Sequence, residues 1–146
     1  MAVANKFIEL SGGHGVTHMK LQKLIYLAHE EYVRRTGQPL VTANPEVWQY
    51  GPVFGWLYHM LKRYQKAPIT EQQSIFPGGP PSTLTDPNVI NIVQDVWNKY
   101  GGLSAVQLFD LTHRIGTPWR TLAERHGYNV PRGLEITPAD IAKSSR

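Results

Sequence analysis

The stretch HMKLQKLIYLAHEEYVRRT, residues 18–36, carries the clearest helical pattern in the chain. Its apolar residues recur at intervals of three and four, as on one face of an α-helix; they are Leu21, Leu24, Ile25, Ala28 and Tyr32. Thr17 is a favourable N-cap residue just before this pattern, and Gly37 follows it as a helix terminator. We therefore predict a helix over residues 18–36 with one apolar face.

The same periodicity predicts shorter helices on both sides of this segment. We place them over residues 1–10, 52–66, 87–100, 105–113, 118–126 and from residue 138 onward. Proline begins several of them, Pro52 among them, and suits the first helical turn because its missing N–H would be unpaired there. Asp86 can cap the helix at residue 87, and Ser104 with Gln107 gives the Ser-x-x-Gln pattern of a capping box.

The remaining segments are predicted to be turns and loops with little strand. Residues 67–87 are rich in proline and glycine, which favours a long loop. One short strand is expected over residues 47–50, with pairing to residues 69–75 as one option. Residues 142–146 are predicted to fray. We therefore expect a mainly α protein, a compact single domain over residues 1–146 with six or seven short helices, with or without one small β-hairpin.

The composition favours a soluble, cytoplasmic protein. The chain has 146 residues, the length of one domain, and no cysteine, which excludes disulfides, thiolate catalysis and Cys-ligated zinc. The net charge of +4 is scattered without a dense basic tract, so nucleic acid is not the expected partner. Neither a signal-like leader nor an apolar run of the ~20 residues that cross a bilayer is evident, so no membrane association is expected.

A second stretch, QYGPVFGWLYHMLKRY at residues 49–64, is unusually aromatic. Its spacing fits an amphipathic helix better than a platform for nucleic-acid bases. The predicted core face comprises Val53, Trp56, Leu57, Met60, Leu61 and Tyr64. The remaining rings and charges are the predicted partner-binding residues; they are Phe54, Tyr58, His59, Lys62 and Arg63. Exposed aromatic clusters of this kind are typical of protein-binding hot spots.

No catalytic or metal-binding pattern is evident. The six histidines include no His-x-x-His or His-Glu-x-x-His pair, and neither a Gly-x-Ser-x-Gly elbow nor a P-loop lysine is present. We therefore expect no catalytic residues, no metal and no cofactor. The alternative is an enzyme that uses the histidines with Asp95, Asp110 or Glu124 in one cleft, which requires these groups to converge.

Three ordered stretches resemble one known family. They are THMKLQKLIYLAHEEYVRRTGQPL from residue 17, VWQYGPVFGWLYHMLKRY from residue 47 and GGLSAVQLFDLTHRIGTPW from residue 101. In this order and at these distances they are similar to the Panacea domain, the SocA-like antitoxin family, which includes phage-associated GepA-like proteins. The motif residues that carry the resemblance are Lys20, Gln22, Lys23, Trp48, Tyr50, Gly51, Pro52, Thr112, His113, Pro118 and Trp119.

This resemblance implies a mainly helical antitoxin, encoded by a bacterium, phage or prophage, that neutralises a toxin protein by direct binding. It also implies, for some members, an adaptor role in which the toxin is handed to a protease, so the cognate toxin and a protease are the implied partners. The segment NVPRGLEITPADIAKSSR departs from the pattern because it lacks the aromatic ending expected of the last helix. The alternatives are a nucleic-acid-binding regulator and a phage protein without a toxin partner.

We expect most of the motif residues to be structural, and weight that above direct contact with a toxin. A buried Tyr50 hydroxyl would need a hydrogen-bond partner, and His113 is the predicted one. Trp119 is expected to close against Trp48 or Tyr50.

Overall fold

The computed structural model describes residues 1–145, and within them the chain forms seven α-helices, one 3-10 helix and a two-stranded sheet. The elements are α1 (Ala2–Leu10), α2 (His18–Thr36), β1 (Glu46–Trp48), β2 (Gly51–Val53), α3 (Gly55–Leu61), η1 (Lys62–Tyr64), α4 (Pro87–Tyr100), α5 (Ala105–Thr112), α6 (Pro118–Arg125) and α7 (Pro138–Lys143). The predicted mainly α architecture with a small hairpin is confirmed. No helix in residues 1–145 combines the length and apolarity that crossing a bilayer demands.

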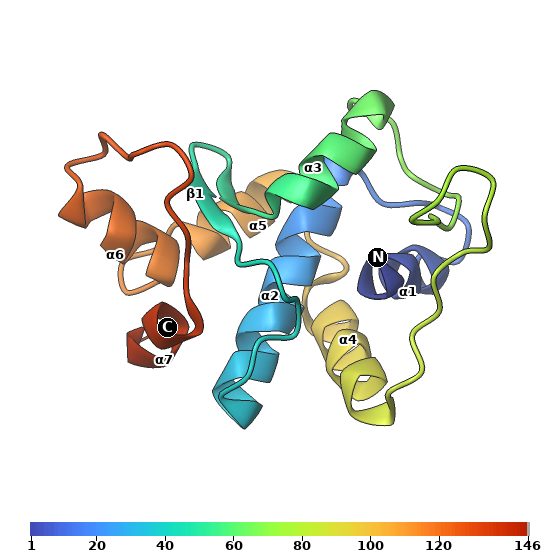
Figure 1. Cartoon of the computed structure of the whole chain (residues 1–146), viewed down its shortest axis with the longest axis horizontal. Helices are drawn as coiled ribbons and strands as arrows, with labels where there is room; N and C mark the ends of the chain where they lie inside the picture. The colour runs from blue at the N-terminus through green and yellow to red at the C-terminus, as the bar shows by residue number, and fades with distance from the viewer. Residues whose placement is uncertain (146) are drawn as a thin grey trace.

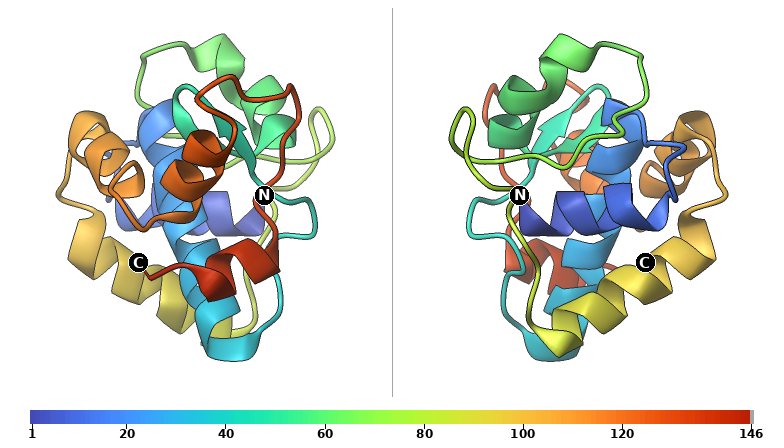
Figure 2. Two further views of the ribbon diagram at one scale, coloured as in Figure 1. Left: turned by 90° about the vertical axis from the view of Figure 1, so that its left-hand side faces the viewer. Right: turned by 90° about the vertical axis from the view of Figure 1, so that its right-hand side faces the viewer.

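Helix α2 is the central element of the fold. Figure 1 shows it running through the middle of the molecule, with α1 and α4 on one side and α6 and α7 on the other. It contacts α1, α3, α4, α5, α7 and β2, and the side views of Figure 2 show α1 and α4 crossing it. Because neighbours cover most of its circumference, α2 buries polar side chains as well as the predicted apolar face, including Gln22, Lys23 and His29.

Local capping chemistry fixes most helix boundaries. Asp86 accepts a hydrogen bond from the N–H of Asn88 at the start of α4, and Ser104 with Gln107 forms the predicted capping box at α5. At α2 the predicted end at Gly37 is confirmed, and the predicted capping by the Thr17 side chain is not. Thr17 has the extended backbone of an N-cap residue, but its side chain makes no capping hydrogen bond. Gly37 ends α2 in the left-handed conformation, at φ +74°.

The two strands form a local hairpin, which differs from the predicted pairing. Strand β1 pairs antiparallel with β2, and residues 49–50 make the turn between them. The option of pairing with residues 69–75 was wrong, because Ile69 forms an isolated bridge with Val16. Pro52 lies in β2 and does not begin a helix. Val47, opposite it, directs its N–H away from β2 to the carbonyl of Leu134 at 2.9 Å, so the two residues are not a hydrogen-bonded pair and the ladder does not use an N–H at Pro52.

The segment between η1 and α4 contains no helix and is tied to α1 by one buried side chain. Asn5 donates hydrogen bonds to the carbonyls of Gln73 (2.7 Å) and Ser82 (2.8 Å) and accepts one from the N–H of Gln73 (2.6 Å). At the other end of the chain, the prediction of fraying over residues 142–146 falls partly outside the described residues, and α7 itself extends to Lys143.

Candidate functional site

The side chain of Gln22 determines where the hairpin ends and α3 begins. It is fully buried, and its amide oxygen accepts the N–H of Phe54 at 3.0 Å while its amide nitrogen donates to the carbonyl of Phe54 at 3.2 Å. This paired contact holds Phe54 extended as the N-cap of α3 and directs its ring into the core. The expectation that Phe54 is exposed was therefore wrong, as was the helix start at Pro52, whereas its predicted role in partner binding remains a prediction.

Lys23, the next residue along α2, is buried without a counter-charge. Only 2% of its surface is exposed, and its Nζ donates one long hydrogen bond of 3.4 Å to the carbonyl of Pro52. No ion pair in residues 1–145 involves Lys23. Burial disfavours the charged ammonium and lowers the pKa of Lys23 to about 7. This lysine is thus poised between its neutral and charged forms near neutral pH.

Gly51 allows the hairpin to approach this lysine closely. Its φ of +99° lies in the region that favours glycine, and a Cβ there would sit 2.8 Å from Cε of Lys23 and 2.9 Å from Cε1 of His113. Both the backbone conformation and the space exclude a side chain. The hairpin turn, Lys23 and His113 are therefore in tight contact.

His113 lies between two aromatic rings. Its ring centroid is 3.6 Å from that of Phe109 and 3.8 Å from that of Trp119. Its Nδ1 is 2.6 Å from the carbonyl of Phe109, which identifies Nδ1 as the protonated nitrogen, and its buried Nε2 has no hydrogen-bond partner. Burial lowers the pKa of His113, opposed chiefly by the Phe109 carbonyl and assisted by the charges of Lys23 and Arg120, so the imidazole is neutral at neutral pH.

Two contacts were predicted for the aromatic motif residues: Trp119 against Trp48 or Tyr50, and Tyr50 with His113. The first is present and the second is not. Trp119 donates from its indole nitrogen to the carbonyl of Trp48 at 2.7 Å, as predicted. Tyr50 was expected to be buried, with its hydroxyl bonded to His113, and this was wrong. It stands in the hairpin turn with 48% of its surface exposed, because Gly51 turns the chain immediately after it.

The other motif residues also make contacts within the chain. Lys20 donates to the carbonyl of Gly101 at 2.6 Å, beside the ring of Trp97. Thr112 donates to the carbonyl of Leu108 at 3.1 Å, and Pro118 begins α6 in a buried position. These contacts are compatible with a structural role. That the motif residues as a set are structural remains a prediction.

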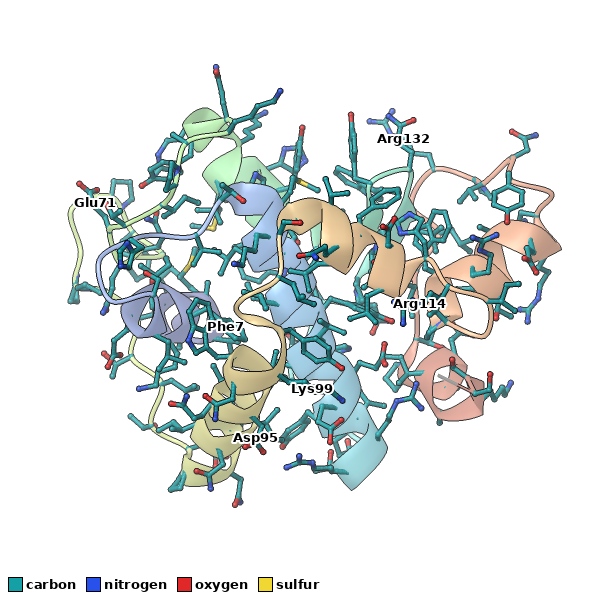
Figure 3. All side chains as sticks on the ribbon, turned by 180° about the vertical axis from the view of Figure 1, so that it is seen from behind. Phe7, Glu71, Asp95, Lys99, Arg114 and Arg132 are labelled. Atoms are coloured by element: carbon teal, nitrogen blue, oxygen red, sulfur yellow. The ribbon has the colours of Figure 1, made fainter. Side chains whose placement is uncertain are left out.

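An open apolar groove of about 450 Å³ lies between α2, the hairpin turn and α5, directly above Lys23. The α2–α5 groove is lined by Met19, Lys23, Tyr50, Ala105, Val106, Phe109 and Asp110. Val106 is 71% exposed, and Phe109 is exposed as well. Seen from behind, in Figure 3, α5 lies across the N-terminal half of α2. The groove therefore presents exposed apolar side chains above one buried lysine.

Sequence reasoning missed this groove, although one feature of α5 could have indicated it. Leu108 and Leu111 are buried on one side of α5, whereas Val106 and Phe109 are exposed on another. A helix of eight residues with apolar residues on two sides has more apolar surface than a single core contact needs.

The predicted partner-binding residues other than Phe54 lie on α3 and η1. Tyr58 is half-buried, with its ring centroid 4.9 Å from that of Trp48 and 5.3 Å from that of His18. His59, Lys62 and Arg63 are exposed. Arg63 is held against the loop by a 3.1 Å hydrogen bond to the side-chain oxygen of Gln73. A role for these residues in partner binding remains a prediction.

The titratable residues considered for an enzyme are distributed over separate elements. Asp95 on α4 pairs with Arg35, and Glu124 on α6 pairs with Arg120, while Asp110 borders the α2–α5 groove. Within residues 1–145 no three side chains of metal-ligating type come together. Burial lowers the pKa of His18 and of His29 to about 4, aided at His18 by the charge of Lys23, so both rings are neutral core residues at neutral pH.

Comparison with known proteins assigns the chain to a family. Residues 21–120 match the family described as "Antitoxin SocA-like, Panacea domain". The chain is also 30% identical to "Antitoxin SocA" of Caulobacter vibrioides (strain NA1000 / CB15N), over 92% of this chain and 76% of that protein. No solved structure matches the chain. The matched residues 21–120 include most of the α2–α5 groove and the whole hairpin.

Proposed function

The chain belongs to the SocA-like antitoxin, Panacea domain family, and on this premise we propose that it neutralises a toxin protein by binding it through the α2–α5 groove. The family is one of antitoxins and not of enzymes. An antitoxin of this kind acts by contact, so the decisive feature is a surface that a partner protein can cover.

The observation that carries the proposal is the set of apolar side chains left uncovered around the groove. Tyr50, Val106 and Phe109 come from the hairpin turn and α5 and line one depression. Contiguous exposed apolar surface of this kind usually marks a site of interaction, and aromatic anchors near its centre tend to supply most of the binding free energy. The groove is therefore a surface where a toxin would gain from apolar contact.

The predicted residues on α3 and η1 enter the proposal as a second contact area. His59, Lys62 and Arg63 offer charge and hydrogen-bond donors but little apolar surface. Groups of this type at the rim of an interface steer association more than they stabilise the complex. The proposal concerns an encounter in the cytoplasm, and it requires neither delivery to a protease nor an origin in a phage.

Co-expression with candidate toxins, beginning with the product of the adjacent gene, tests the proposal. We expect the wild-type chain to restore growth and to co-purify with the toxin. Val106→Asp places a charge in the groove and should abolish both effects, while its circular dichroism spectrum stays unchanged because Val106 is exposed. Ile115→Asp is the matched control, since Ile115 is 84% exposed and does not line the groove. Full rescue by Val106→Asp would contradict the assignment of the groove.

A further inference from the structure

The charge at the base of the α2–α5 groove points to the chemistry of the segment that the groove receives. Lys23 lines this groove with 2% of its surface exposed, whereas the side chains around it are mainly apolar. Its one hydrogen bond, to the carbonyl of Pro52, is long at 3.4 Å. An ammonium group has three donors, so the free chain leaves much of the bonding capacity of Lys23 unused.

A buried ammonium without a counter-charge is costly to a folded protein. Removing a charge from water costs several kcal/mol unless an opposite charge and hydrogen bonds compensate, and an apolar residue of similar volume is often more stable in such a position. No acidic side chain in residues 1–145 supplies that compensation to Lys23. Because Lys23 lines the α2–α5 groove, a partner that occupies the groove could supply one.

The groups around Lys23 define what this partner must bring. His113 is neutral and adds no second positive charge. Asp110 lines the groove but is exposed and forms no ion pair with Lys23. Because Asp110 already brings one negative charge to the groove, a ligand carboxylate is favoured only where it reaches Lys23, and the complementary ligand has one carboxylate within an otherwise apolar segment.

We propose that the toxin inserts an aspartate or glutamate side chain, flanked by apolar residues, into the α2–α5 groove, and that its carboxylate pairs with Nζ of Lys23. The apolar neighbours of the acidic residue would cover Tyr50, Val106 and Phe109. We assign the carboxylate to a side chain within the segment because the exposed apolar residues come from two elements, Tyr50 from the hairpin turn and Val106 and Phe109 from α5, and a segment can contact both. This inference rests on the proposed function and names the chemistry of its partner.

The direct test is isothermal titration calorimetry of the purified toxin with three forms of this chain. Lys23→Met removes the charge but keeps an apolar stem, and we expect it to weaken binding about 30-fold or more, as when one member of a buried charged pair is truncated. Lys99→Met is the matched control, because it removes a lysine from the exposed surface of α4, where Figure 3 labels it. Lys99→Met should bind as the wild type does.

Proton uptake provides a readout that a purely structural role would not change. The free lysine, with a pKa of about 7, is about half protonated at pH 7, and a carboxylate would raise that pKa. Complex formation at pH 7 should therefore take up about half a proton, measured from the dependence of the binding enthalpy on the ionisation enthalpy of the buffer. The Lys23→Met variant should lose this uptake, and Lys99→Met should keep it.

The possible outcomes separate this inference from the proposed function. If Val106→Asp abolishes binding while Lys23→Met changes neither affinity nor proton uptake, the groove is correct and the acidic anchor is wrong. If Val106→Asp binds normally, the proposed function through this groove fails first. Replacing single acidic residues of the toxin by Asn or Gln should identify one whose effect is lost in the Lys23→Met background. If instead amidation of the toxin's C-terminal carboxylate has that effect, the internal side chain is excluded.

Discussion

Gln22 and Lys23 are adjacent on α2, equally buried, and differ in how their polar groups are satisfied. Gln22 makes two short hydrogen bonds with the backbone of Phe54. Lys23 makes one long hydrogen bond to the backbone of Pro52, without a counter-charge. The first contact accounts for the geometry of the hairpin and α3. Because burying an uncompensated charge is costly, we expect the second contact to destabilise the free chain, and this expectation underlies our proposal that Lys23 serves binding.

The largest effect is expected where the satisfied contact is broken. Gln22→Leu keeps an apolar side chain of similar length but leaves the N–H of Phe54 buried and unpaired, and it removes the 3.2 Å contact with Nε2 of His18. The carbonyl of Phe54 loses one of its two hydrogen bonds and keeps the one that it accepts from the N–H of Tyr58 at 3.0 Å. The unpaired N–H costs about 1–3 kcal/mol and each of the other two lost contacts about 1 kcal/mol, so we expect the free energy of unfolding to fall by about 3–4 kcal/mol. Urea denaturation followed by tryptophan fluorescence measures it. A loss below about 1 kcal/mol would show that water or a shifted backbone replaces the Gln22 amide, and the contrast with Lys23 would disappear.

The next effect tests how closely the hairpin approaches Lys23. Gly51→Ala adds a Cβ at φ +99°, only 2.8 Å from Cε of Lys23 and 2.9 Å from Cε1 of His113. Backbone strain and overpacking each cost roughly 1–3 kcal/mol, so we expect a loss of about 3 kcal/mol.

Shortening the lysine separates these two contributions. In a Lys23→Ala background the steric part of the Gly51→Ala penalty should decrease, while the part due to the backbone angle should remain. A double-mutant cycle on the free energies of unfolding measures the difference. Strictly additive effects would contradict the close contact between Gly51 and Lys23.

The same contrast explains what the sequence could and could not predict. The pattern of α2 and the capping residues Asp86 and Ser104 are local, and the elements that they predict are present. The burial of Phe54 depends on Gln22, a residue 32 positions away, so no local pattern contains it. Local periodicity assigned residues 52–66 to one helix, whereas the hairpin extends to Val53 and α3 begins only at Gly55, so that Phe54 is buried where it was expected to be exposed.

The candidate site was harder to predict for the same reason. The groove needs the hairpin turn, α2 and α5 at once, and the exposure of Tyr50 depends on the turn at Gly51. Lys23 stood out in the sequence only through the family resemblance, because a lysine at its position on an amphipathic helix is usually solvated. What distinguishes it is burial, and burial is a property of the packed elements.

The smallest effect concerns the unsatisfied lysine itself, and its sign is the informative part. Lys23→Met removes the buried ammonium, so we expect the free chain to become more stable by about 1–2 kcal/mol at pH 7. The pKa of Lys23 is about 7 in the folded chain and 10.5 as a reference value for the unfolded chain. Between these values the unfolded state binds more protons, so wild-type stability should rise with pH across this range.

The Met variant lacks this contribution, so its advantage should be greatest at or below pH 7 and shrink as the pH approaches 10. Urea denaturation at pH 6, 7, 8 and 9 measures the difference, with Lys99→Met as the surface control that should follow the wild type. A destabilised Lys23→Met variant with an unchanged pH profile would mean that the lysine is charged and compensated in the free chain. Such a lysine would have no need of a carboxylate from a partner, and the contrast with Gln22 would reduce to two structural contacts.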